Sequence, residues 1–189
     1  SSGLLCIHTE GSQDNLPIFE QLAVLNEVKL WHIYMPFCNK SELVTKVNET
    51  ELVGYFNISL KLLTRDSAIH AYGVDCLYEH GKIVMIGKSV SEWPGCKIPF
   101  DSGWTHSDMD IKEVNAIIDV TSPTSAKTCM IFTIDPKVRV PQSIINFAVK
   151  NLAGLLLCRI QNEAKKASDE PETSPYAKAI KKNLGRSQV

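Results

Sequence analysis

Residues 4–9 form a short, mostly apolar run, which predicts a β-strand. A helix is predicted next, because Pro17 suits a first turn and apolar side chains then recur at spacings of three and four residues. These side chains are Ile18, Phe19, Leu22, Leu25 and Val28. We expect the helix to end near Trp31, since Pro36 prevents an easy continuation.

The middle of the chain, to about residue 135, has the short apolar runs of β-strands, rich in Val, Ile, Tyr, Phe and Thr. The predicted strands span 43–47, 52–60, 67–78, 83–90, 113–120 and 128–134. The clearest turn is Glu79-His80-Gly81-Lys82, which joins two long strands as a hairpin. Short links between consecutive strands predict an antiparallel sheet.

One connection, residues 91–112, is long and irregular and contains Trp93, Phe100 and Trp104. Exposed aromatic side chains make a disordered loop costly, and long ordered loops in compact domains are commonly functional. We therefore expect a structured lid. Its aromatic side chains either insert into a membrane interface or cap the core, and we expect a mixture of the two.

The longest predicted helix follows, with Pro141 in its first turn and Lys165 and Lys166 near its end, where positive charge suits the helix dipole. Its broad apolar face consists of Ile144, Ile145, Ala148, Val149, Leu152, Leu155, Leu156 and Ile160. Residues 167–189 carry few large apolar side chains and are predicted to form a flexible C-terminal tail after a domain of residues 1–166.

This order of elements predicts an α+β fold, in which a curved antiparallel β-sheet wraps around the long C-terminal helix. Along the strand that begins at Ser67, alternate side chains point to the same face, and one face is lined mainly by small residues. Its residues are Ser67, Ile69, Ala71, Gly73 and Asp75. Small residues on one face leave an internal cavity that a ligand fills, or else large side chains of the terminal helix pack into the space.

Composition and charge limit the classes of function that this chain can have. The chain has 189 residues, 44% of them hydrophobic, and a net charge of −1, which fits one globular domain and disfavours a nucleic-acid partner. We find no apolar run long enough to span a membrane and no metal-ligand spacing among the histidines. The six cysteines are scattered, without C-x-x-C, which favours buried thiols in a reducing, cytoplasmic compartment.

Several features in this order resemble the START (StAR-related lipid transfer) domain, which has the helix-grip fold. A strand ends in Glu10-Gly11 before a helix, Trp31 follows that helix, and Arg65-Asp66 opens a long strand. A strand ending in Ile134-Asp135-Pro136-Lys137 is followed by Val140-Pro141-Gln142-Ser143-Ile144-Ile145-Asn146 at the start of the last helix. The resemblance covers residues 4–166 approximately and implies that the N-terminal helix and first strands usual in the family are missing or altered.

The resemblance implies a non-enzymatic domain that holds one lipid, such as a phospholipid, sterol or related amphipath, in an internal hydrophobic tunnel under the 91–112 lid. It needs no cofactor besides the bound lipid. We expect a monomer that touches membranes transiently. The lipid-binding residues are then Trp31, His32, Arg65, Ile69, Ala71, Gly73, Asp75, Trp93, Phe100, Trp104, Ile145, Val149, Leu152 and Leu156.

Departures from the family limit the choice of lipid. Val28 and His32 stand where phosphatidylcholine-binding members have an Arg and an Asp, and Ala71 stands where sterol-binding members have an Arg. Neighbouring Arg65 and Asp66 point to opposite faces of a strand, which favours structural partners for each.

Two other functions stay open. One is an enzyme of the polyketide cyclase or aromatase type, in which His32, Tyr72 or Asp75 acts as acid or base. That reading requires at least two of these side chains to converge. The other is a regulatory module whose ligand changes its binding to a protein. His32 contacts a lipid headgroup or simply ends the helix, and Asp75 lies near the mouth of the sheet or bonds a hydroxyl or cation.

Overall fold

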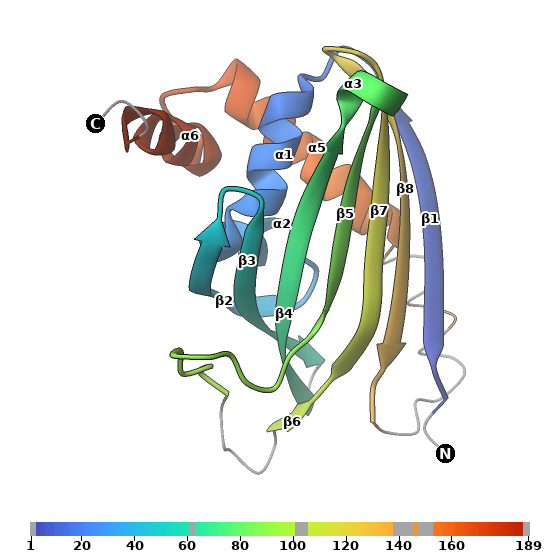
Figure 1. The fold of residues 1–189 in the computed structure, drawn as a ribbon, viewed down its shortest axis with the longest axis vertical. Helices are drawn as coiled ribbons and strands as arrows, with labels where there is room; N and C mark the ends of the chain where they lie inside the picture. The colour runs from blue at the N-terminus through green and yellow to red at the C-terminus, as the bar shows by residue number, and fades with distance from the viewer. Residues whose placement is uncertain (1–2, 61–62, 101–105, 138–145, 147–152, 187–189) are drawn as a thin grey trace.

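The computed structural model describes residues 3–60, 63–100, 106–137, 146 and 153–186. Its centre is an eight-stranded sheet (Figure 1). Seven strands follow the order β1-β8-β7-β5-β4-β3-β2, and β6 pairs with β4 outside this path. The strands are β1 (Leu5–Gln13), β2 (Cys38–Asn48), β3 (Glu51–Leu60), β4 (Leu63–Cys76), β5 (Lys82–Ser89), β6 (His106–Asp108), β7 (Asp110–Ser122) and β8 (Ser125–Asp135). Neighbours on this path pair antiparallel, as predicted, whereas β6 lies parallel to the start of β4.

The predicted hairpin between two long strands is confirmed. β4 and β5 pair from Ile69 opposite Ser89 to Cys76 opposite Lys82. The turn between them is the short helix α3 (Leu77–His80), which ends at Gly81 with a φ of +65°. A glycine suits this left-handed position because it has no Cβ to clash with the backbone.

Helices lie against one face of the sheet, which we call the inner face (Figure 1). They are α1 (Ile18–Asn26), the 3-10 helix η1 (Val28–Leu30), α2 (Trp31–Tyr34) and α5 (Ala153–Asp169). The first predicted helix is thus divided after Asn26. The indole N–H of Trp31 donates to the Leu25 carbonyl at 2.9 Å, so a carbonyl near the end of α1 gains a partner from beyond the break.

Alternation along β3 and β4 defines the two faces of the sheet. Val28 and Trp31 pack with Phe56 and Ile69 in one buried cluster, so these strand positions face the helices. At Gly54 an added Cβ would lie 2.8 Å from Val28 and 3.0 Å from Trp31, which explains why a glycine stands there. The residues between them, such as Tyr55 and Ala68, point to the opposite face, which we call the outer face.

The C-terminal segment differs from the flexible tail that the sequence predicted. Residues 167–169 continue α5, and Pro175–Arg186 form the helix α6. Tyr176 is fully buried, and its hydroxyl donates to the Leu30 carbonyl at 2.7 Å. The segment has few apolar residues, but Tyr176 and Ala177 are both buried, and α6 contacts α1 and α5. A small number of well-placed side chains is enough to dock a short helix.

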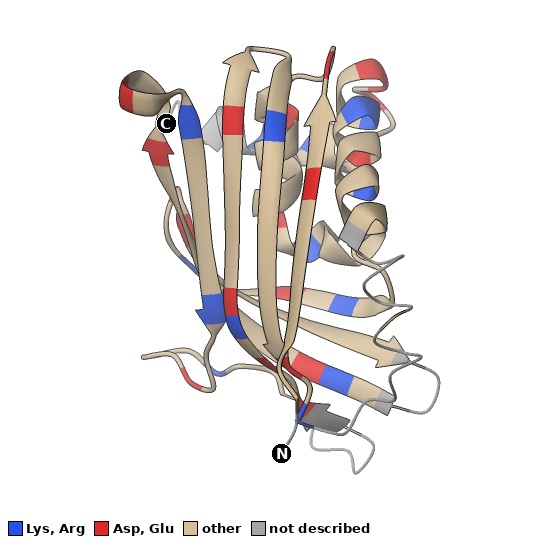
Figure 2. Cartoon of the chain, turned by 90° about the vertical axis from the view of Figure 1, so that its right-hand side faces the viewer, with Lys and Arg blue, Asp and Glu red and all other residues tan. Residues whose placement is uncertain are grey.

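Within the described residues, every helix is too short or too polar to cross a membrane. Figure 2 shows acidic and basic residues interspersed along α5, while the long strands carry few charged residues. Among the described residues of this view the two signs are mixed, in keeping with the near-neutral net charge of −1.

Candidate ligand-binding site

Two parts of the inner face are filled by helical side chains. Ile18 of α1 packs in a buried cluster with Ile83, Ile118 and Ala126 of the sheet. Leu157 of α5 packs on Ala116 and Met130. These contacts close the inner face near the α3 end and under the middle of α5.

The next positions toward β6 are less completely covered. Ala71, Gly87, Val114 and Phe132 lie in register across β4, β5, β7 and β8, and we call them the inner row. Ala71, Val114 and Phe132 are only half-buried, unlike the fully packed neighbours at Ala116 and Met130. The row is therefore a continuous, mostly apolar strip that the described helices leave partly accessible.

The β4 and β5 positions of the inner row, Ala71 and Gly87, have small side chains or none. An added Cβ on Gly87 would lie 2.9 Å from the end of Ile69 and 3.5 Å from Ala71, so Ile69 occupies part of this space. On the other half, Val114, Ile134 and Leu156 pack beside the main core cluster while staying partly exposed. The strip thus has an apolar floor, and Leu156 of α5 packs against the same core cluster as Ala71 and Val114.

A single cation, Arg65, stands at the described inner-face positions of β3, β4, β5, β7 and β8, six residues before Ala71 on β4 and toward β6. Arg65 stands opposite Ile58, half-buried, and its guanidinium donates to the Thr64 carbonyl at 3.2 Å. Among the described residues no carboxylate pairs with it. Arg has five N–H donors, and the contact with Thr64 uses one of them.

Asp66 has the structural role that alternation predicted for it. It points to the outer face, is 1% exposed, and accepts a hydrogen bond from the Tyr55 hydroxyl at 3.0 Å. Arg65 and Asp66 therefore act on opposite sides of the sheet, and Asp66 fixes the start of β4 against β3.

The structure brings four of the predicted lipid-binding residues into one cluster. Trp31 and Ile69 belong to the main core cluster between the sheet and the helices, and Ala71 and Leu156 pack against it. Trp31 uses its indole N–H within the protein, so its contribution to a ligand is apolar surface. Gly73 lies one step farther along the inner face of β4, toward α3. The predicted residues Trp104, Ile145, Val149 and Leu152 lie outside the described residues.

His32 and Asp75 do not join this cluster. His32 is exposed, and its Nδ1 lies 3.2 Å from the Ser41 hydroxyl. Asp75 is exposed near the end of β4, where its carboxylate accepts the backbone N–H of Leu77 at 2.9 Å. Both side chains stabilise local turns, and neither faces the inner row.

The described part of the predicted lid, residues 91–100, does not cover the inner face. The ring centroid of Trp93 lies 4.7 Å from that of His70, and Phe100 meets Tyr55 edge to face at 6.1 Å. His70 and Tyr55 both point to the outer face. The outer face of β3 and β4 carries buried apolar residues that need cover, and the loop aromatics supply it.

Other inner-face residues were missed in the sequence. Gly87, Val114, Phe132 and Ile134 lie on strands that were predicted, but their neighbours depend on strand order. Alternation within each strand was readable from the sequence. The pairing that aligns Ala71 with Gly87 and Val114 was not.

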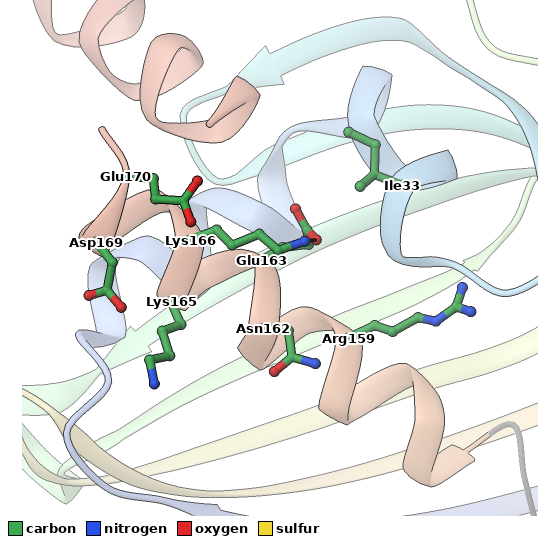
Figure 3. Close-up of a pocket in the computed structure, with 8 residues that line it drawn as sticks. All are labelled: Ile33, Arg159, Asn162, Glu163, Lys165, Lys166, Asp169 and Glu170. Carbon is green, nitrogen blue, oxygen red and sulfur yellow. Dashed lines mark hydrogen bonds and ion pairs between the residues drawn. The ribbon is translucent and has the colours of Figure 1, made fainter. Parts of the chain in front are cut away.

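A separate cleft of about 470 Å³ lies between α2 and α5 (Figure 3). Its walls are Ile33, Arg159, Asn162, Glu163, Lys165, Lys166, Asp169 and Glu170. The Lys166 ammonium reaches back to the Glu163 carboxylate at 2.6 Å, and the other labelled side chains project in several directions. The described residues that line this cleft all come from α2, α5 and Glu170, so it is distinct from the strand positions of the inner row.

No protein-family model and no curated protein sequence matches this chain. Solved structures match it by shape. Human STARD10 superposes with a TM-score of 0.66 at 15% identity, over 93% of this chain and 71% of that one. A STAR-related lipid transfer protein from Xanthomonas axonopodis gives 0.66 at 16% identity, over 87% and 95%. The ZhuI aromatase/cyclase from Streptomyces gives 0.59 at 9% identity, over 90% and 99%. The chain therefore has the helix-grip fold of START domains.

Proposed function

We propose that this domain binds one lipid, such as a phospholipid, sterol or related amphipath, between the inner face of its sheet and α5, and carries it between membranes. The observation that carries the proposal is the inner row: a half-buried, mostly apolar strip that spans four strands on the helix-covered face of the sheet. A ligand that covers apolar surface of this kind stabilises the complex by about 25 cal/mol for each Å² removed from water.

The polar end of the ligand is assigned to Arg65. Its guanidinium is the cation at the described inner-face positions of the strands, at the β6 end of β4, and phosphate or carboxylate oxygens match its fork of donors. An apolar body on the strip with a polar group at one end is the common plan of lipid and small-molecule sites.

The enzyme interpretation receives less support from the geometry. Its candidate acids and bases lie apart: His32 is on α2, Tyr72 is on the outer face of β4, and Asp75 is near the α3 end. General acid-base catalysis requires such groups within reach of one substrate atom. The similarity to ZhuI is one of fold, so we propose binding without bond-making as the function.

The proposed setting is cytoplasmic, with the domain a monomer that meets membrane surfaces transiently. Scattered cysteines without a disulfide pattern support the reducing compartment. A regulatory role requires a protein partner whose binding changes with the ligand. A pull-down with and without the ligand therefore distinguishes it from lipid transfer.

Native mass spectrometry of the detergent-free protein, followed by organic extraction, tests the binding step. We expect one co-purified or vesicle-acquired lipid per chain. Val114→Trp fills the strip and is expected to weaken lipid binding by about tenfold or more. Ile117→Trp is the matched control, because it lies on the same strand but points to the outer face and is 42% exposed.

The outcomes separate the alternatives. Equal lipid content in both variants would contradict the placement of the ligand on the inner row. A wild-type protein that stays empty after incubation with mixed-lipid vesicles would contradict lipid binding itself. Lipid that is bound yet never moved between donor and acceptor vesicles would leave binding intact and contradict transfer.

A further inference from the structure

Three side chains with metal-binding atoms meet on the outer face where β1 pairs with β8. Glu10 of β1 stands directly opposite Cys129 of β8, and His8 lies two residues before Glu10 on the same side of the strand. The His8 Nε2 atom is 3.2 Å from the Cys129 sulfur and 3.2 Å from a Glu10 carboxylate oxygen. All three donor atoms lie within 4.8 Å of one another.

We propose that His8, Glu10 and Cys129 form a Zn²⁺ site. Imidazole nitrogen, thiolate sulfur and carboxylate oxygen are the three protein ligands that Zn²⁺ takes, with bonds of about 2.0 to 2.3 Å. In a tetrahedron these bond lengths place neighbouring donors about 3.4 to 3.6 Å apart. The two separations at His8 Nε2 are close to this value, so small side-chain rotations bring the donors around one ion.

The sheet holds these residues in place. β1 and β8 pair without a register shift from Leu5 opposite Ile134 to Gln13 opposite Ala126. On the other side of Cys129, β7 places Ile117 directly opposite it. The backbone positions of the three ligands are thus fixed by ladder hydrogen bonds before any ion arrives, which lowers the ordering cost of binding.

The site is open to solvent and independent of the lipid site. The His8 and Glu10 side chains are 53% and 69% exposed, so an ion reaches them without any movement of the fold. Three protein ligands leave a fourth position for water or a further donor. Because the ligands come from two strands, bound Zn²⁺ joins the edge strand β1 to β8 and stabilises the folded chain.

Binding of Zn²⁺ alone to the purified, reduced full chain tests the site by isothermal titration calorimetry. We expect one ion per chain, with proton release because the thiol must lose its proton to bind. His8→Ala and Cys129→Ser are each expected to weaken binding by at least about tenfold, since loss of a supporting residue alone costs that much at zinc sites. Cys158→Ser is the control: Cys158 is also free and exposed, but lies on α5.

Co²⁺ substitution gives a second readout. Coordination by Cys129 is expected to produce a thiolate-to-cobalt charge-transfer band that persists in Cys158→Ser and disappears in Cys129→Ser. Circular dichroism checks that each variant is folded. The proposal is overturned if His8→Ala binds Zn²⁺ as tightly as the wild type, or if the thiolate band survives in Cys129→Ser. Neither result would bear on lipid binding, which the inner-row variants test.

Discussion

The docking of α6 predicts a measurable loss of stability on substitution of Tyr176. Its side chain is fully buried, and its hydroxyl donates to the Leu30 carbonyl at 2.7 Å. If α6 is part of the cooperative core, changes at Tyr176 reduce the free energy of unfolding of the whole domain. If the segment is a tail, they change the local helix alone.

The hydrogen bond of the hydroxyl and the packing of the ring contribute separately to the expected loss in the free energy of unfolding. Tyr176→Phe keeps the ring and removes the hydroxyl that donates to the Leu30 carbonyl, which is expected to cost about 1 to 2 kcal/mol. Tyr176→Ala also removes a buried ring and leaves a cavity, which brings the expected cost to about 3 to 5 kcal/mol. The difference between the variants measures the packing of the ring.

Urea unfolding, followed by tryptophan fluorescence and circular dichroism, measures these losses. Trp31 lies next to Leu30 in the chain, so its emission reports on the core that Tyr176 contacts. Tyr78→Phe and Tyr78→Ala are matched controls, because Tyr78 is 98% exposed and its substitution is expected to change stability little. An unchanged urea midpoint in Tyr176→Ala would refute the inference that α6 belongs to the core.

Two further predictions concern pH and the outer face. Burial raises the pKa of the Cys38 thiol from 9.0 to about 11 and raises the pKa of the Tyr34 hydroxyl well above 10. Both groups therefore ionise at a lower pH in the unfolded chain than in the folded chain. The stability they contribute is complete below pH 9 and is lost as the pH rises toward 11. Urea midpoints are therefore expected to fall over this interval, less so in Cys38→Ala, and a midpoint that stays constant to pH 10.5 would contradict the assignment. Trp93→Ala removes the ring contact with His70 and is expected to lower stability by about 1 kcal/mol while leaving lipid transfer between vesicles unchanged. Faster or slower transfer at unchanged stability would instead support a lid.

The sheet was the most predictable part of this protein. β-strands of five or more residues leave a period-two signal that needs no knowledge of partners, and the strand from Ser67 was correctly divided into its two faces. The assignment of Asp66 to a structural partner followed from the same alternation. Strand order was less accessible, since β5 lies beside β7 and β1 beside β8 through contacts distant in sequence.

The errors concern segments whose position depends on packing with a distant partner. Residues 91–100 have the aromatic side chains of a lid, but the apolar outer face of β3 and β4, formed by Tyr55 and Ala68 among others, determines where they pack. The α6 segment has low overall hydrophobicity, and a few buried side chains, Tyr176 and Ala177 among them, dock it. In both cases composition described the segment correctly, while the location was set by a surface elsewhere in the chain.

The separation of the two faces bears on how a ligand reaches the inner row. The described part of the 91–100 loop is committed to the outer face, where Trp93 contacts His70 and Phe100 contacts Tyr55. Opening these contacts exposes the back of β3 and β4 and leaves the inner row unchanged, because the sheet lies between them. Movement of α5 relative to the sheet has the opposite effect, since Leu157 of α5 packs on Ala116 and Met130, the positions next to the strip. Ligand entry by the proposed function therefore requires displacement on the α5 side of the sheet, and variants of the outer aromatic contacts act on stability alone.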